Sequence, residues 1–154
     1  MLVYVMNMVL PSAAVAVSQE FGRHRTVLNA GWRFHRGDLE AAEASSFDDS
    51  EWNAVGLPHS FSLPYFLSPH FYVGFGWYRK HVNVTSDLAA RRFTLEFEGA
   101  FQVAEVFVNG IAVGTHQGGY TSFAFDITAA LKPGDNVIAV RVNNEWNARL
   151  APRR

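Results

Sequence analysis

The sequence predicts an all-β protein, a β-sandwich of the jelly-roll type. Within residues 92–120, Phe93, Leu95 and Phe97 alternate with polar residues, which is the two-residue period of a strand with one buried face. The pair Asn109-Gly110 separates two β-rich runs, and both residues tolerate the positive φ of a type I′ turn, so it predicts a hairpin. About seven strand-like segments recur at intervals of roughly 8–15 residues with almost no helical pattern, which favours a sandwich. Long connections between early and late strands favour a jelly roll over a meander.

Taken in order, the chain reads as one domain of strands and loops. We interpret residues 92–120 as the centre of an antiparallel sheet. Residues 38–50 hold the only plausible helical turn, and residues 58–76 are rich in proline and aromatic residues without a usable period, which predicts a long surface loop. The other expected strands are 27–36, 77–84, 123–127 and the last clear strand around Ile138, Val140 and Val142.

The bulk composition excludes several classes of function. The 154 residues are 49% hydrophobic and 14% aromatic, enough for one real core. The net charge of -1 and the pI near 6.6 do not favour nucleic acid or an acidic membrane as partner. With no cysteine, disulfides, thiolate metal sites and a cysteine nucleophile are all excluded.

The first 25 residues predict an apolar tail or a signal peptide, followed by a polar linker. Residues 1–17 carry no charged side chain, and Ala14-Val15-Ala16 has the A-x-A pattern of a cleavage site. The lack of Lys or Arg at the start and the interruption by Pro11 count against a signal peptide, and both readings stay open. The protein is therefore either exported to the periplasm or medium, or cytoplasmic, and residues 26–154 form the domain.

No catalytic constellation emerges from the titratable residues. Glu96 and Glu98 share one strand face, but they occupy its solvated side and fit a wet surface better than a carboxylate pair. The histidines show no metal-ligand spacing, so neither a metal nor another cofactor is expected. These histidines are His24, His35, His59, His70, His81 and His116.

The aromatic loop is the better candidate for binding. Its rings can stack on the apolar face of a sugar, pack against a neighbouring domain, or simply cover one end of the sandwich. The rings we single out as possible sugar or interdomain contacts are Tyr65, Tyr72, Trp77 and Tyr120.

Several ordered motifs resemble the N-terminal sugar-binding domain of glycoside hydrolase family 2, which includes β-galactosidases, β-glucuronidases and β-mannosidases. The similarity covers about residues 27–149. Its most specific pieces are Leu57-Pro58-His59, Trp77-Tyr78-Arg79-Lys80, Val108-Asn109-Gly110, Gly118-Gly119-Tyr120 and Phe125-Asp126-Ile127-Thr128.

The resemblance implies a galactose-binding-domain-like jelly roll that precedes an immunoglobulin-like domain and a (β/α)8 barrel. In that family the catalytic glutamates lie in the barrel, and the jelly roll helps to hold the terminal sugar of a β-glycoside. The family's sugar-contacting residue falls on Asn147, its following arginine on Arg149, and the histidine of its Pro-His loop on His59.

Two departures from the family pattern affect this reading. Ser60-Phe61 replaces the family's Asp-Trp, which removes a carboxylate. After Arg149 the family's next motif and strand are not found, so we expect the jelly roll to lack its last strand and to expose an unpaired, association-prone edge. The alternatives to an accessory domain are a free-standing carbohydrate-binding module, with Tyr65, Tyr72 and Trp77 as its platform, and a non-functional gene fragment.

Overall fold

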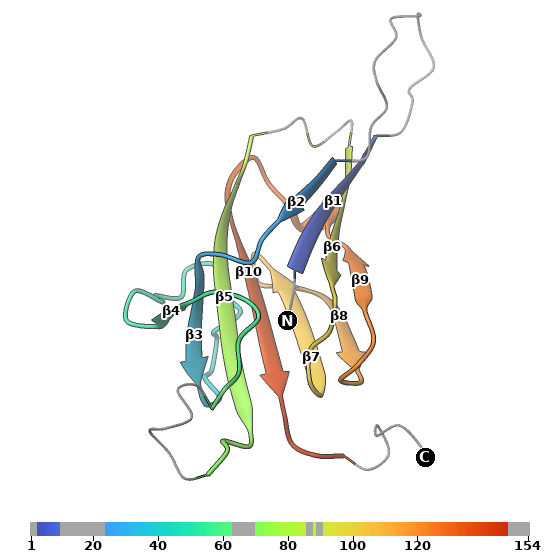
Figure 1. Ribbon diagram of the computed structural model, residues 1–154. Coiled ribbons are helices and arrows are strands. Elements are labelled where there is room, and N and C mark those ends of the chain that lie inside the picture. Colours follow the sequence, from blue (N-terminus) through green and yellow to red (C-terminus); the bar gives the residue numbers. More distant parts are fainter. Residues whose placement is uncertain (1–2, 10–23, 63–69, 86–87, 89–90, 148–154) are drawn as a thin grey trace, which may run out of the picture.

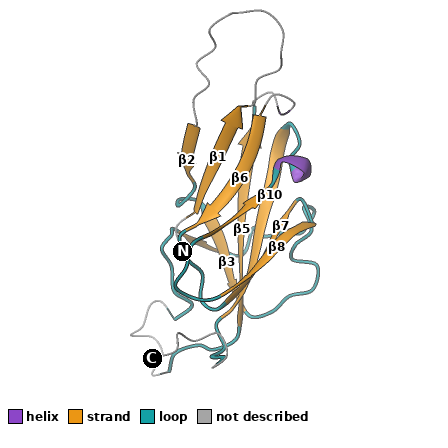
Figure 2. Ribbon diagram, turned by 90° about the vertical axis from the view of Figure 1, so that its right-hand side faces the viewer, coloured by secondary structure: helices purple, strands orange, loops and turns teal. Residues whose placement is uncertain are grey.

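Two antiparallel sheets pack face to face, and the strands that form them run along the length of the molecule (Figures 1 and 2). The structure is a computed structural model, and it describes residues 3–9, 24–62, 70–85, 88 and 91–147. The strands within these residues are β1 (Val3–Val9), β2 (His24–Val27), β3 (Trp32–Arg36), β4 (Asn53–Val55), β5 (Phe75–Val84), β6 (Arg91–Phe97), β7 (Val103–Val108), β8 (Ile111–Gln117), β9 (Phe123–Asp126) and β10 (Gly134–Asn143). One sheet has the order β2-β1-β6-β9 and the other β4-β3-β5-β10-β7-β8. The predicted all-β sandwich is confirmed.

The main core fills the space between the two sheets. Strand β6 turns Phe93, Leu95 and Phe97 inward, as the alternation in the sequence predicts, and β7 contributes Val106 and Val108 from the opposite sheet. The predicted hairpin joins β7 to β8, with Asn109 and Gly110 at φ of 52° and 82°. Period-two patterning therefore sets which side chains meet between the layers.

A second, smaller core lies on the outer face of the larger sheet. The segment 38–52 covers Trp77 of β5 and Ala139 of β10 with its own Ala42 and Trp52. This cover explains why β10 is buried at five consecutive positions rather than at alternate ones.

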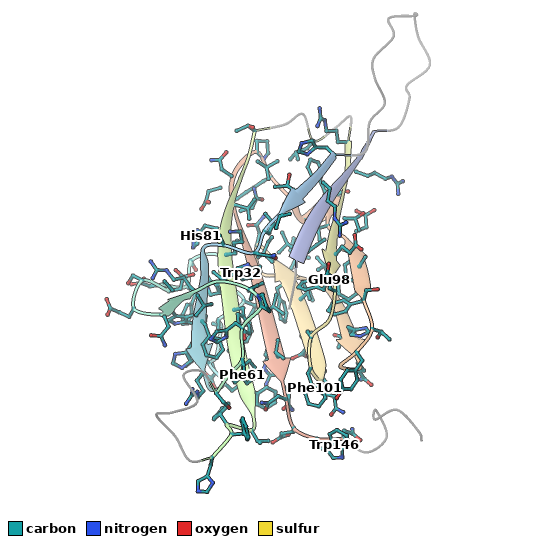
Figure 3. All side chains as sticks on the ribbon, in the orientation of Figure 1. Trp32, Phe61, His81, Glu98, Phe101 and Trp146 are labelled. Carbon is teal, nitrogen blue, oxygen red and sulfur yellow. The ribbon has the colours of Figure 1, made fainter. Side chains whose placement is uncertain are left out.

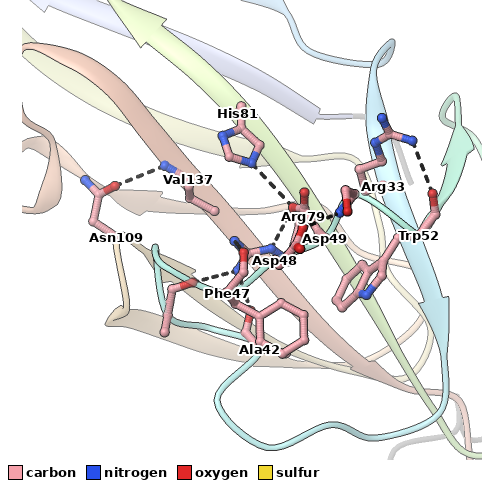
Figure 4. Close-up of polar contacts among 12 residues, drawn as sticks. Arg33, Ala42, Phe47, Asp48, Asp49, Trp52, Arg79, His81, Asn109 and Val137 are labelled. Carbon is pink, nitrogen blue, oxygen red and sulfur yellow. Dashed lines mark hydrogen bonds and ion pairs between the residues drawn. The ribbon is translucent and has the colours of Figure 1, made fainter.

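The expected helical turn in residues 38–50 is wrong: this segment is a series of turns. Ala41 has a φ of 56°, which interrupts any helix. The carbonyl oxygens of Ala42, Ala44 and Phe47 accept hydrogen bonds from the guanidinium of Arg79 instead of from a helix (Figure 4). The side chain of Arg79 is fully buried beneath the segment.

Two further expectations about strands need correction. Residues 27–36 are not one strand, because β2 ends at Val27 in one sheet and β3 begins at Trp32 in the other, with Gly31 at a φ of 72° in the crossing. Residues 92–120 are not the centre of one sheet. Strand β6 lies in the smaller sheet, β8 is the edge of the larger one, and β5 and β10 form the larger sheet's centre.

The N-terminal residues that we expected as a tail contain strand β1, which lies between β2 and β6 and pairs with both (Figure 1). Among the described strands, the sheet edges are β2 and β9 in one sheet and β4 and β8 in the other. Cleavage of a signal peptide stays a prediction. No helix in the described residues has the length and apolar character to cross a membrane.

Candidate functional site

A pocket of about 500 Å³ opens between the sheets, at the end of the sandwich where β6 and β10 finish. Figure 3 shows Phe61 and Phe101 at this end of the molecule. The lining combines apolar rings with a few polar groups, which is the usual composition of a small-molecule site. The residues that line the pocket are Pro58, His59, Ser60, Phe61, Tyr78, Glu98, Gly99, Ala100, Phe101, Gly119, Val142 and Asn144.

A neutral hydrogen-bonded pair forms the polar part of the inner wall. Nδ1 of His59 lies 2.8 Å from the hydroxyl oxygen of Tyr78, and the imidazole packs against Phe34 with ring centroids 4.6 Å apart. Burial lowers the pKa of His59 and raises the pKa of the Tyr78 hydroxyl, because removal from water disfavours both charged forms. At neutral pH the pair therefore offers uncharged donors and acceptors.

The segment after β10 is fixed to this end of the sandwich by Gln102, which is 1% exposed. Its Oε1 accepts a hydrogen bond from the backbone N–H of Asn147 at 2.7 Å, and its Nε2 donates to the carbonyl of Asn147 at 3.3 Å. The backbone N–H of Gln102 also donates to the carbonyl of Asn143 at 2.8 Å. Gln102 thus holds the main chain that carries Asn147.

Asn144 is a second anchor of the same segment. Its Nδ2 donates to the carbonyl of Tyr72 at 2.8 Å, and its Oδ1 accepts from the N–H of Gly74 at 2.7 Å. With its amide hydrogen-bonded on both sides, Asn144 ties the segment to the loop before β5. Its role is to hold the pocket wall.

Three aromatic rings gather beside the pocket. Phe101 lies edge to face with Tyr120 at 5.9 Å and roughly parallel to Trp146 at 6.3 Å between ring centroids. Phe101 rests on Gly119, where an added Cβ would lie 2.1 Å from Cδ2 of the ring, so only glycine permits this approach. Tyr120 and Trp146 are 72% and 64% exposed, and their rings are open to a ligand or partner.

The structure separates the residues that sequence reasoning grouped together. His59, Tyr120 and Asn147 lie at the pocket end of the sandwich. Tyr65 and Arg149 lie outside the described residues.

The expected aromatic platform does not form as predicted. Trp77 is 3% exposed in the second core, and its Nε1 donates to Asp38, so its ring is not available to a sugar. Tyr72 is half-buried against the main core, and its hydroxyl donates to the carbonyl of Phe75. Both rings face segments of the same chain, which a pattern of aromatic residues does not reveal.

The residues that sequence reasoning missed are Glu98, Phe101, Gln102 and Trp146. Glu98 was assigned to a solvated strand face, and it does lie exposed, but at the pocket. The break in alternation after Phe97 was the available signal, since residues 98–102 leave the strand and turn to this end. Within the described residues, no group of three or more His, Asp or Glu side chains could hold a metal ion.

Comparison with known proteins agrees with the sequence motifs. The family profile described as glycosyl hydrolases family 2, sugar binding domain, matches residues 44–151. The chain belongs to this family. The predicted resemblance is thereby confirmed.

The relatives are much longer than this chain. β-Galactosidase BoGH2A of Bacteroides ovatus is 39% identical over 132 residues, covering 79% of this chain and 16% of its own length. A β-glucuronidase of Formosa agariphila is 33% identical over 128 residues, covering 76% of this chain and 13% of its own length. The crystal structure of Bacteroides uniformis β-glucuronidase matches with a TM-score of 0.74 and 35% identity over 81% of this chain and 15% of that one. The matched part is the sugar-binding domain, and the catalytic domain of the relatives lies outside these 154 residues.

Proposed function

We propose that this chain acts as the accessory sugar-binding domain of a longer β-glycosidase, at the edge of whose active site it contacts the terminal sugar. The parent reaction would be retaining hydrolysis of a β-glycosidic bond, with both catalytic carboxylates on a barrel domain that follows an immunoglobulin-like domain. The family match carries this proposal, and the nearness of His59 and of the Asn147 backbone to the same end of the sandwich supports it.

Asn147 is the proposed main sugar contact. Arg149 follows it in the same motif, and His59, from the separate Pro-His loop, is the third proposed contact. Gln102 fixes the backbone of Asn147 on both its N–H and its carbonyl. A side-chain amide held on a fixed backbone can donate to one sugar hydroxyl and accept from another. A rigid support of this kind reduces the conformational entropy lost on binding.

The aromatic rings beside the pocket favour a contact surface as well. Phe101, Tyr120 and Trp146 take the place of the platform expected from Tyr72 and Trp77. Exposed aromatic rings are suited both to the apolar face of a sugar and to packing against another domain. A free-standing carbohydrate-binding module is the second candidate, and these three rings are the observation that favours it.

Titration of the isolated chain tests the proposal. Methyl β-D-galactoside added to ¹⁵N-labelled protein should shift the amide signals of Phe101, Gln102 and Asn147. Asn147→Ala should weaken binding by about tenfold, as expected for loss of one or two hydrogen bonds to a neutral ligand. Asn83→Ala, on the exposed part of β5 near the opposite end, is the matched control and should bind like the wild type.

Three results separate the candidates. Hydrolysis of an aryl β-glycoside by the chain alone would contradict the accessory role. Retardation by several polysaccharides in affinity electrophoresis, lost in Trp146→Ala, would favour the free-standing module. Binding that is unchanged in Asn147→Ala would remove the proposed sugar contact.

A further inference from the structure

We propose that the pocket beside Phe101 selects a neutral sugar ring over a sugar acid, and that the carboxylate of Glu98 excludes the acid. This inference rests on the proposed function and deepens it by naming the substrate class. The relatives' names do not decide it, because they include both β-galactosidases and β-glucuronidases.

The charges around the pocket give the first support. Among the described residues that line it, Glu98 carries the one formal charge at neutral pH. Burial holds the pKa of His59 below its ordinary value, so the imidazole is not a cation for a sugar carboxylate. The positive charge of Arg36 lowers the pKa of His59 further. The guanidinium of Arg36 is itself engaged within the protein, since it donates to the carbonyl of Phe61 and lies over the ring of Tyr72.

The remaining groups suit a neutral ring. The carboxylate of Glu98 can accept hydrogen bonds from sugar hydroxyls. The hydroxyl of Ser60 and the His59–Tyr78 pair are uncharged hydrogen-bonding groups for the remaining sugar hydroxyls. Phe101 and the exposed Trp146 present apolar ring faces at the same end. A hexose with an uncharged C6 hydroxymethyl group can satisfy all of these groups, whereas a uronic acid brings its negative charge toward Glu98.

The expected discrimination follows from the Coulomb energy of two negative charges. If the two carboxylates lie about 6 Å apart, their repulsion weakens binding of the sugar acid roughly threefold in fully water-like surroundings. At an effective dielectric constant near 20, the same repulsion weakens binding about a hundredfold. Glu98 is exposed, so we expect a preference of about three- to tenfold, decreasing as salt is added.

A matched pair of ligands tests this. Methyl β-D-galactoside and methyl β-D-galacturonide differ only at C6, and their affinities for the full chain can be compared by NMR titration at low ionic strength. Glu98→Gln should shift the ratio of the two affinities by about three- to tenfold toward the galacturonide, and this ratio is the readout because loss of a carboxylate acceptor affects both ligands alike. The control is Glu96→Gln, the same charge change two residues away on β6 and outside the pocket lining, and it should leave both affinities unchanged.

The outcomes distinguish this inference from the proposed function. Equal or tighter binding of the galacturonide by the wild type would overturn the neutral-sugar preference while leaving a sugar-binding domain. Arg149→Gln would then show whether the arginine beside Asn147 supplies the cation. An unchanged preference in Glu98→Gln would remove Glu98 as its cause. Failure to bind either ligand at tens of millimolar would overturn the sugar contact itself, and this inference with it.

Discussion

Replacing Arg79 by methionine should destabilise the domain more than any surface substitution. The Arg79 side chain is completely buried, and its Nε donates to Oδ2 of Asp49 at 2.8 Å (Figure 4). Nη1 donates to the carbonyls of Ala42 and Ala44 at 2.6 and 2.9 Å, and Nη2 to that of Phe47 at 3.2 Å. One guanidinium therefore holds the 38–52 segment on the sheet at four of its residues, Ala42, Ala44, Phe47 and Asp49.

The magnitude follows from what the substitution leaves behind. Methionine fills much of the volume, but Asp49 loses its ion pair with Arg79 and keeps only the longer contact with His81. The carbonyls of Ala42, Ala44 and Phe47 each lose the guanidinium donor, and that of Ala44 keeps the N–H of Phe47. Breaking one side of a buried ion pair costs about 3–5 kcal/mol. The free energy of unfolding of the whole domain is expected to be only about 5–15 kcal/mol, so this loss is a large fraction of it. At about 2–4 °C per kcal/mol for a chain of this size, the melting temperature should fall by roughly 6–20 °C.

Urea unfolding followed by tryptophan fluorescence measures this directly, because Trp52 lies in the affected cluster. Arg79→Lys should fall between the wild type and the methionine variant, since an ammonium keeps the charge but not the planar fork. Arg33→Met is the control. Arg33 is the cross-strand neighbour of Arg79 and makes one hydrogen bond, to the carbonyl of Trp52, so its loss should cost about 1 kcal/mol or less. A methionine variant at position 79 within about 1 kcal/mol of the wild type would refute the reasoning.

Two further predictions concern the pocket end. Gln102→Leu should release the backbone of Asn147, so hydrogen exchange at the Asn147 amide should accelerate by about tenfold or more. The global free energy of unfolding should fall by about 1–2 kcal/mol. Protection of this amide equal to that of the wild type would argue against Gln102 as the anchor. His59 has its pKa lowered by burial, so the unfolded chain takes up its proton first, and stability should fall as the pH drops below about 6.5. His59→Gln should remove this component, and denaturant titrations at pH 5 and pH 8 check it; a stability advantage of the wild type over the variant that grows toward acid would contradict the sign.

The sandwich, the β7–β8 hairpin and the family could all be predicted from the order of the amino acids. These depend on local chemistry that survives in any context. Alternation assigns Phe93, Leu95 and Phe97 to one face whatever lies opposite. Positive φ at Asn109-Gly110 follows from the residue types, because Gly110 lacks a Cβ and asparagine tolerates this region.

Which polar and aromatic groups face water depends on the folded arrangement of the whole domain. Trp77 lies on β5 and Tyr120 just after β8, yet Trp77 is buried under the 38–52 segment and Tyr120 lies open beside Phe101. Period-two patterning tells which residues share a face, but not whether a distant segment covers that face. The same reason hides Arg79 and Gln102 from sequence reasoning, because each acts through backbone groups more than 30 residues away. Burial and the pocket are properties of contacts between remote parts of the chain, and those contacts exist only once both sheets and their covering segments have folded.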